Sequence, residues 1–371
     1  RSFKVLQKPG QKWHLQGYAG MLGNYVLMMF YTTVAGWMLI YIYYMSSGKF
    51  AGLDSTEVEN IFGGMLANPM LMIGGMVIIV VVGFVICSLG LQKGVEKITK
   101  VLMILLLGIM VILAINSIML EGSGEGLRFY LVPNFTTMKE IGLRKILLEA
   151  MNQAFFTLSL GIGAMAIFGS YLSKERTLLG EAFNIAILDT FVAIVAGLII
   201  FPAAFAYGVK PDSGPSLIFI TLPNIFNAMP GGRIWGSLFF IFMLFAAFST
   251  VIAVFENIMS SCMDLWGWTR KKAAIINTVL VTILSLPCIL GFNILDLEDF
   301  VVSNLLLPIG ALIYTLFCVS RKGWGWDKYK EEANTGKGIK VPQWMRGYST
   351  WILPIIIIIV IVNGLISTLF R

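Results

Sequence analysis

Two hydroxyl residues and two glycines lie close together inside an apolar segment (151–172) that is long enough to cross a membrane. They are Thr157, Ser159, Gly161 and Gly163. Glycine makes unwinding of a helix easier, and hydroxyls can satisfy the backbone groups that unwinding frees, or can face a ligand. The two half-helix ends then favour an anion and a cation. The segment therefore predicts a broken helix at a binding site, with close helix–helix packing as the alternative.

Three other apolar stretches also carry polar residues. Asp189 lies well inside one of them, and an intramembrane carboxylate is a functional-site hypothesis unless a neighbouring hydroxyl simply satisfies it. Ser249 and Thr250 are adjacent hydroxyls in mid-span, which suit a dehydrated cation with oxygen ligands; bonds to the preceding helical turn are the alternative. Tyr31 lies in an aromatic-rich stretch near the start of the chain. Most aromatic residues of that stretch are expected to pack or to lie at the membrane interface, whereas Ser249 and Thr250 favour a site for a hard cation.

The composition indicates the elements that must position these residues. The chain has 371 residues, of which 57% are hydrophobic and only 13% are charged. A soluble domain carries about 25% charged residues. Apolar runs of about twenty residues recur along the whole chain, which predicts an all-α, polytopic helical membrane protein.

Enzyme and metal-cluster chemistry find little support in the sequence. The four cysteines lie singly in different apolar spans: Cys87, Cys262, Cys288 and Cys318. They suggest neither a disulfide framework nor a zinc site, and the single histidine, His14, rules out a histidine cluster. We find no nucleophile–base pair and expect no enzymatic activity.

We predict nine membrane spans, at about 19–46, 69–90, 99–120, 151–172, 180–208, 233–262, 273–292, 300–319 and 350–370. Nineteen of the 27 lysines and arginines lie in the loops that alternate on one side of these spans. The positive-inside rule then places the first residue in the cytoplasm and the last outside. The net charge of +7 is explained by this topology, so we expect a lipid bilayer and no nucleic acid as a partner.

Three loops are longer than simple turns. Residues 121–150 are expected to form a polar and aromatic external segment. Residues 209–232 alternate turn signals with apolar patches, which favours two short helical segments that fold back as an external cap. Residues 321–349 are basic and contain tryptophan, which suggests a cytoplasmic linker at the membrane surface.

Five stretches together resemble the neurotransmitter:sodium symporter family, in its prokaryotic amino-acid transporter branch, which has the LeuT fold. The third helix of that family and its lead-in resemble KWHLQGYAGMLGNYVLMMFYTTVAGWMLIY, and the loop into the fifth resembles LQKGVEKITKVLMILLL. The broken sixth helix resembles NQAFFTLSLGIGAMAIFGSY, the external cap GPSLIFITLPNIF, and the eighth helix FFIFMLFAAFSTVIAVFEN.

The resemblance implies that the nine spans are family helices three to eleven. The first two helices, one of which is also broken in the family, are then expected to be absent from this chain. We expect a single transporter domain over 1–371. It comprises the remainder of the first repeat with the external loop (1–150), the second inverted repeat (151–320), and the cytoplasmic linker with the final helix (321–371).

The resemblance also implies roles for particular residues. The substrate site would comprise Leu27, Tyr31, Phe156, Thr157, Ser159, Ile162 and Val254, with Tyr31 bonded to the substrate carboxylate. One sodium ion would be held by Ala246, Ser249 and Thr250, and another by Thr157 and Asp189. Gating would involve Phe156, Tyr171, Phe219, Asp264 and Asp299.

The function implied is sodium-coupled symport of a hydrophobic, aliphatic or aromatic, amino acid into the cell by alternating access. We expect it in the plasma (inner) membrane. Asp189 stands where many members have Asn, and Ala193 stands where chloride-dependent members have Ser. Because the charge of Asp189 can replace that of chloride, Na⁺ is the expected co-transported ion and chloride is not expected.

Two alternatives of other classes stay open at this point. One is a non-transporting protein of the same fold, either truncated or dependent on a partner. The other is a channel, which would need a continuous polar stripe along several helices, whereas the polar residues here cluster at one depth.

Overall fold

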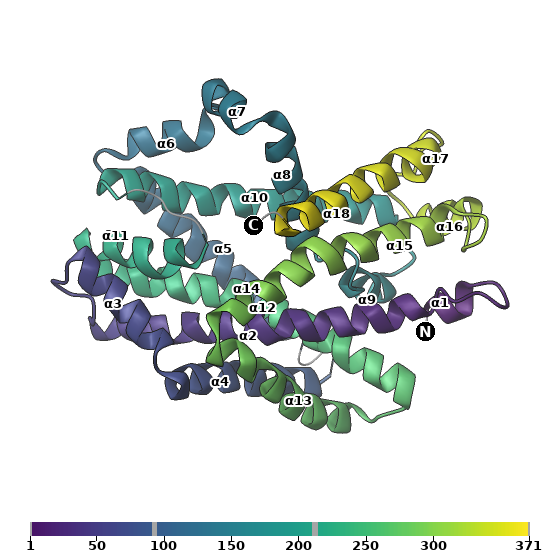
Figure 1. Cartoon of the computed structure of the whole chain (residues 1–371), viewed down its shortest axis with the longest axis horizontal. Helices are drawn as coiled ribbons and strands as arrows, with labels where there is room; N and C mark the ends of the chain where they lie inside the picture. The colour runs from purple at the N-terminus through teal and green to yellow at the C-terminus, as the bar shows by residue number, and fades with distance from the viewer. Residues whose placement is uncertain (1, 91–94, 210–213, 370–371) are drawn as a thin grey trace.

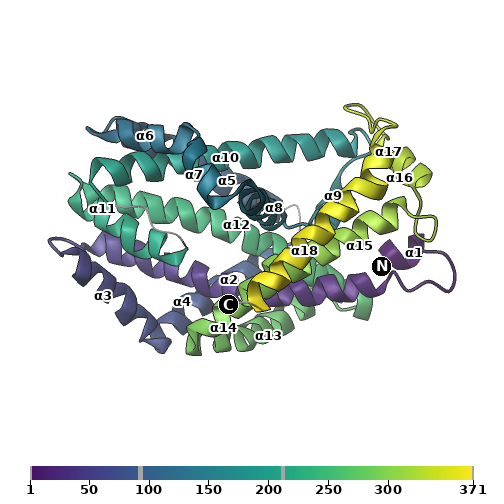
Figure 2. The ribbon, with the colours of Figure 1, turned by 45° about the horizontal axis from the view of Figure 1, so that its top comes forward.

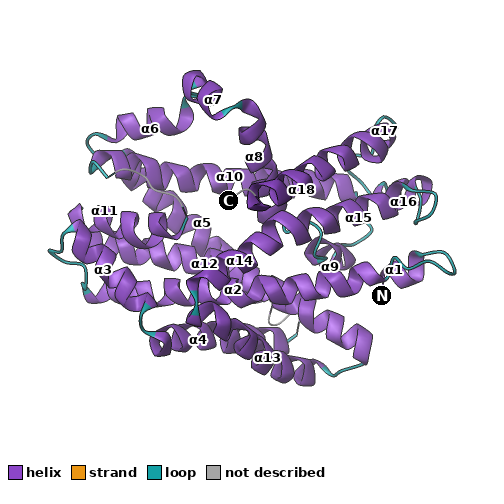
Figure 3. Ribbon diagram, viewed as in Figure 1, coloured by secondary structure: helices purple, strands orange, loops and turns teal. Residues whose placement is uncertain are grey.

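The computed structural model describes residues 2–90, 95–209 and 214–369, and helices dominate these ranges (Figures 1 and 3). The α-helices are α1 (Ser2–Leu6), α2 (Leu15–Ser47), α3 (Ser55–Leu66), α4 (Pro69–Ser88), α5 (Lys97–Ile118), α6 (Ser123–Leu131), α7 (Phe135–Ile141), α8 (Leu143–Thr157), α9 (Ala164–Tyr171), α10 (Leu178–Ala206), α11 (Leu222–Ala228), α12 (Gly232–Trp266), α13 (Arg270–Leu290), α14 (Phe292–Phe300), α15 (Leu307–Val319), α16 (Trp326–Ala333), α17 (Met345–Gly347) and α18 (Leu353–Leu369). Short π-helical segments precede α11, α15 and α18, at Leu217–Thr221, Val301–Leu306 and Tyr348–Ile352.

Eight helical segments in the described ranges are long and apolar enough to cross a membrane. They correspond to eight of the nine predicted spans. The span predicted at 300–319 begins earlier, because α14 continues through a π-helical segment into α15. The remaining predicted span, 151–172, is divided between α8 and α9. The all-α, polytopic membrane architecture predicted from the sequence is therefore confirmed.

Four long helices, α2, α4, α12 and α13, pack against one another and form what we call the scaffold (Figures 1 and 2). Small residues allow this close approach. A Cβ added at Gly36 of α2 would lie 2.7 Å from the backbone nitrogen of Met76 in α4. Gly83 of α4 makes room in the same way for Phe255 of α12, whose ring stacks on Phe84 with centroids 3.8 Å apart.

The external cap predicted within residues 209–232 consists of a π-helical turn and α11, and residues 210–213 lie outside the described ranges. Phe219 of this turn is fully buried. Its ring packs against those of Trp37 and Tyr41 in α2 and stacks on Phe62 of α3. The Tyr41 hydroxyl also donates to the carbonyl oxygen of Phe219 at 2.8 Å. The prediction that apolar residues of this loop dip into the protein is confirmed.

Residues 121–150, predicted as an external segment, contain α6, α7 and the start of α8. Helix α6 lies along α10 (Figures 1 and 2). The ring of Tyr130 in α6 packs directly against Gly197 in α10. A Cβ added at Gly197 would lie 2.1 Å from Cζ of this ring. Its hydroxyl donates to the carbonyl oxygen of Ala193 at 3.3 Å. The segment is thus ordered by packing on a membrane helix.

The predicted cytoplasmic linker, 321–349, contains α16 and α17 and is attached to the rest of the protein at two places. Arg176, in the connection between α9 and α10, forms an isolated parallel bridge with Lys337. The indole nitrogen of Trp13 donates to the carbonyl oxygen of Lys322 at 2.9 Å. Trp326 at the start of α16 is buried. This tryptophan therefore packs inside the protein, and the linker is attached to the α9–α10 connection and to the segment that precedes α2.

Candidate functional site

The break predicted in the segment 151–172 is present. Helix α8 ends at Thr157 and α9 begins at Ala164, so six residues between them are not α-helical. Ser159 has φ 48°, and Gly161 and Gly163 have φ 93° and 92°. These left-handed conformations are strained for a residue with a Cβ, which explains the glycines and makes Ser159 an exception.

Close packing also requires a glycine at the centre of the break. A Cβ added at Gly161 would lie 2.2 Å from the carbonyl oxygen of Leu307 in α15, and one at Gly310 would lie 2.2 Å from the carbonyl oxygen of Gly161. The two backbones are therefore in direct contact. Both predictions from the sequence therefore hold for the small residues of the break: they allow the helix to unwind, and they allow a neighbouring helix to approach.

Side-chain amides from other helices bind the carbonyl oxygens of the break. Gln16 of α2 donates to Gly161 O at 3.0 Å, and Asn24 of α2 donates to Ile162 O at 2.8 Å. Asn257 of α12 donates to Ile162 O at 3.4 Å and to the Asn24 side-chain oxygen at 3.2 Å. None of these amides is predicted from the sequence, although a polar side chain inside an apolar span is a signal that could have identified Asn24 and Asn257.

The last residue of α8 is bonded to the intramembrane carboxylate of α10. The Thr157 hydroxyl donates to Asp189 Oδ1 at 2.8 Å. The structure thus brings together two residues that the family resemblance assigns to one sodium site. The same bond is also what is expected when a hydroxyl satisfies a carboxylate within the membrane.

The other predicted sodium ligands lie together near the middle of α12. The Ser249 hydroxyl donates to the carbonyl oxygen of Ala246 at 2.8 Å, which is the back-bonding geometry considered as the alternative. The side chain of Thr250 lies within interaction distance of the Tyr31 side chain in α2. The predicted substrate-carboxylate ligand and a predicted sodium ligand are therefore neighbours across the α2–α12 contact.

The predicted pocket residues are mostly shielded from solvent. Leu27, Ile162 and Val254 have exposed fractions of 4%, 2% and 1%. Phe156 and Ser159 are half-buried. These residues come from α2, the break, α12 and the end of α8, so any pocket they share lies between the broken helix and the scaffold.

The predicted gating residues lie in separate parts of the fold. Asp299 of α14 accepts a hydrogen bond from Ser303 at 3.1 Å. Asp264, near the end of α12, is exposed and lines a cavity of about 810 Å³ that also reaches Gln16, Ile162 and Asn257. Phe219 belongs to the buried aromatic group of the cap. Tyr171 is the last residue of α9, and its side chain lies outside the described part of the structure.

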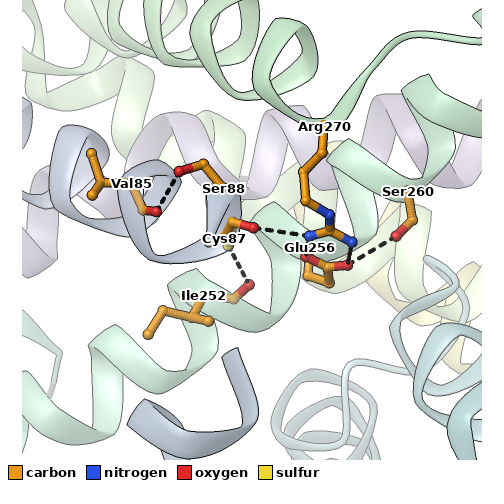
Figure 4. Close-up of polar contacts among 7 residues, drawn as sticks. All are labelled: Val85, Cys87, Ser88, Ile252, Glu256, Ser260 and Arg270. Carbon is orange, nitrogen blue, oxygen red and sulfur yellow. Dashed lines mark hydrogen bonds and ion pairs between the residues drawn. The ribbon is translucent and has the colours of Figure 1, made fainter. Parts of the chain in front are cut away.

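A buried ion pair anchors α12 two residues after Val254. Glu256 is fully buried and accepts two bonds of 2.8 Å from the guanidinium of Arg270 at the start of α13 (Figure 4). Arg270 also donates to the carbonyl oxygen of Cys87 at the end of α4, at 2.9 Å, and Ser260 donates to Glu256 at 3.2 Å. This cluster, which is not predicted from the sequence, joins three of the four scaffold helices.

Comparison with known proteins agrees with this architecture. A model of the "Sodium:neurotransmitter symporter family" matches residues 63–369. An uncharacterized sodium-dependent transporter of Bacillus subtilis, YhdH, is 31% identical over 97% of this chain and 82% of its own length. An uncharacterized sodium-dependent transporter of Haemophilus influenzae is 29% identical over 98% and 82%.

A solved structure, that of MhsT in complex with L-phenylalanine, superposes with a TM-score of 0.83. It is 36% identical in sequence and covers 96% of this chain and 82% of its own. The match confirms the LeuT-type fold that the resemblance implied. This chain therefore belongs to the sodium:neurotransmitter symporter family, and it is a multi-pass membrane transporter of that family, not an enzyme.

Proposed function

We propose that this protein couples the entry of sodium to the uptake of a hydrophobic amino acid by alternating access. The observation that carries the proposal is the 2.8 Å bond between Thr157 and Asp189 at the end of α8, where the helix is broken. It joins a carboxylate and a hydroxyl, both hard oxygen ligands, beside an unwound backbone. A monovalent hard cation is favoured by such a set of groups.

Two sodium ions are accommodated in this proposal. One lies between Thr157 and Asp189, next to the substrate. The other is held by Ser249, Thr250 and the carbonyl oxygen of Ala246 on α12. To bind there, sodium replaces the hydrogen bond that Ser249 makes to Ala246. An ion that binds one arrangement of the helices more tightly than another shifts the population toward it, which is the thermodynamic basis of coupling.

The substrate is a zwitterion whose two charges meet different parts of the break. Its carboxylate is bound by Tyr31 and by the start of α9, because the first backbone N–H groups of a helix have no partner within it. Its ammonium group is bound by carbonyl oxygens at the end of α8. Leu27, Ile162 and Val254 surround an apolar side chain, so leucine, phenylalanine or tryptophan fits better than a charged amino acid. The bound L-phenylalanine of the similar MhsT structure supports this class.

The energy available is sufficient for accumulation. One charge moved across 100 mV is worth about 2.3 kcal/mol, which corresponds to a gradient of roughly 50-fold. Entry of one sodium ion per amino acid therefore supports concentrative uptake when the first residue faces the cytoplasm. We propose this orientation from the distribution of lysine and arginine among the loops.

Chloride has no role in the proposed cycle. Asp189 brings a carboxylate to the sodium site, and Ala193, one helical turn later on α10, offers no hydroxyl to an anion. Uptake should be unchanged when chloride is replaced by gluconate at constant sodium. A loss of uptake under that exchange would contradict this part of the proposal.

Binding of radiolabelled leucine, phenylalanine and tryptophan to the full-length native protein tests the function. We expect binding in sodium and little in potassium. Asp189→Asn should raise the sodium concentration for half-maximal binding about tenfold, because it removes the charge beside the ion. Thr190→Val is the matched control, since the Thr190 hydroxyl donates to the carbonyl oxygen of Ala186 in its own helix. Equal binding in sodium and potassium would overturn the proposal.

A further inference from the structure

The break exposes two backbone carbonyl oxygens that a continuous helix would have used. In an uninterrupted α-helix the oxygens of Gly161 and Ile162 would accept from N–H groups four residues later. Here three amides take that place: Gln16 binds Gly161 O, while Asn24 and Asn257 both bind Ile162 O. Their side chains have exposed fractions of 6%, 1% and 4%. The amides replace hydrogen bonds that the membrane interior cannot supply.

The network leaves little hydrogen-bonding capacity unused. The Asn24 amide nitrogen donates to both Gly20 O, at 2.7 Å, and Ile162 O, and its oxygen accepts from Asn257 at 3.2 Å. Packing supports the same arrangement. A Cβ at Gly20 would lie 3.1 Å from Ile162 O, and one at Gly23 would lie 2.9 Å from Cγ2 of Ile162. Helix α2 is therefore shaped to receive this one residue of the break.

All three donors belong to the scaffold, which is held together independently of the break. Arg270 binds Glu256 and the Cys87 carbonyl across α13, α12 and α4 (Figure 4). Thr32 of α2 and Ser285 of α13 lie in hydrogen-bond contact at 3.2 Å. By contrast, α8 packs on α15 and α18, and the break touches Gly310 of α15. The amide bonds thus join two differently supported parts of the molecule.

We propose that Gln16, Asn24 and Asn257 form a latch that holds the unwound segment to the scaffold and thereby sets the balance between the two access states of the transporter. The inference rests on the proposed function for the meaning of those states. When the broken helix shifts against α2 and α12, the two carbonyl oxygens leave the amides. In the latched arrangement a cavity of about 810 Å³ reaches Gln16, Ile162 and Asn257, so access to this cavity reports on the arrangement that the latch holds. The three amides are positioning residues, since they act through the backbone of the break.

The experiment follows access to this cavity by thiol labelling, which requires no knowledge of the substrate. Ser261 of α12 lines the cavity, and Ser261→Cys provides the reporter. Labelling of the full-length protein by a water-soluble maleimide is timed in sodium and in potassium, with the reporter-free protein as background. The latch variants are Asn24→Leu and Asn257→Leu, with Gln16→Met as a milder change that keeps length and removes the donor.

The latch and the cavity occur together in this structure, so loss of one latch bond should slow labelling in sodium by roughly three- to tenfold per variant, the population shift that corresponds to one lost hydrogen bond. The sodium concentration that halves the labelling rate should change by a similar factor. Asn277→Leu is the matched control, because Asn277 is a fully buried amide bonded to Tyr25 within the scaffold. It should lower stability without changing the labelling rate of the folded fraction.

Unchanged or faster labelling in all three latch variants would overturn the latch. So would an equal slowing in Asn277→Leu, which would mean that any buried scaffold amide has this effect. Failure of the proposed function gives a different result: the parent protein itself would label at the same rate in sodium and potassium. If Asn24→Leu and Asn257→Leu do not fold, Gln16→Met decides alone, since Gln16 lies at the edge of the network.

Discussion

The broken helix and α12 both carry predicted ligands at the centre of the protein, but they are built in opposite ways. Helix α12 runs without interruption over 35 residues, and its buried carboxylate is fixed by Arg270. The chain from α8 to α9 loses its helical bonds over six residues and takes replacements from Gln16, Asn24 and Asn257. One element is held by its own backbone, and the other is held by its neighbours.

This difference explains which groups each element can offer to a ligand. A continuous helix uses its carbonyls internally, so α12 offers mainly hydroxyls, from Ser249 and Thr250. The break offers backbone groups and helix ends, which suit a zwitterion and a cation together. The proposed site thus combines a rigid wall, α12, with a second wall, the break, whose shape depends on a few hydrogen bonds from neighbouring helices.

The largest effect is expected from adding a methyl group to the break. Gly161→Ala places a Cβ 2.2 Å from Leu307 O and 2.6 Å from Ala311 N at φ 93°. Strain and overpacking together amount to about 3 kcal/mol or more, so sodium-dependent binding should fall at least about 100-fold. Gly169→Ala in α9 is the control, since nothing lies within 4 Å of its added Cβ. Parent-like binding by Gly161→Ala would show that the break does not depend on backbone contact.

Loss of the ion pair on α12 should act on stability instead of on ligand binding. Arg270→Gln leaves the buried Glu256 carboxylate without its bidentate partner, which costs about 3 kcal/mol. The melting temperature in detergent should fall clearly, while the folded fraction keeps its sodium dependence. The double variant Glu256→Leu with Arg270→Met should recover part of the loss, because it removes both charges. A change in sodium dependence without a change in melting temperature would contradict the anchoring role.

The sequence alone predicts the architecture and the location of the break. Long apolar runs predict spans because a membrane leaves few alternatives for the backbone. The hydroxyls and glycines from Thr157 to Gly163 favour unwinding or close helix packing, and both occur here. The sequence alone does not predict the amides that bind the carbonyl oxygens of the break. Asn24 and Asn257 lie 233 positions apart in the chain and meet only through the α2–α12 contact. The ion pair between Glu256 and Arg270 could not be predicted either, because Arg270 is the first of three consecutive basic residues, a pattern that is also typical of a loop.

A smaller effect is expected at the junction between α8 and α10. Thr157→Val removes the hydroxyl that donates to Asp189 at 2.8 Å while keeping the side-chain shape. A hydrogen bond to a charged group is worth about 1.5 kcal/mol, so the sodium concentration for half-maximal binding should rise about tenfold. Thr278→Val in α13 is the control, because Thr278 bonds to a carbonyl of its own helix at Ala274. An unchanged sodium dependence would remove Thr157 from the proposed site and leave its bond to Asp189 as a structural one.

The smallest change tests whether α12 acts as a rigid wall. Ser249→Ala removes a hydroxyl that donates to Ala246 O in its own helix, so the free energy of unfolding should change by no more than about 0.5 kcal/mol. If that hydroxyl binds sodium, the half-maximal sodium concentration should nevertheless rise several-fold. Ser237→Ala is the matched control, since Ser237 makes the same kind of bond to Arg233 O in the same helix. A stable Ser249→Ala protein with altered sodium dependence would separate ligand binding from helix stability on α12. No substitution of Gly161 can do this, because in the break the backbone that binds the ligand is also the backbone that its neighbours must hold in place.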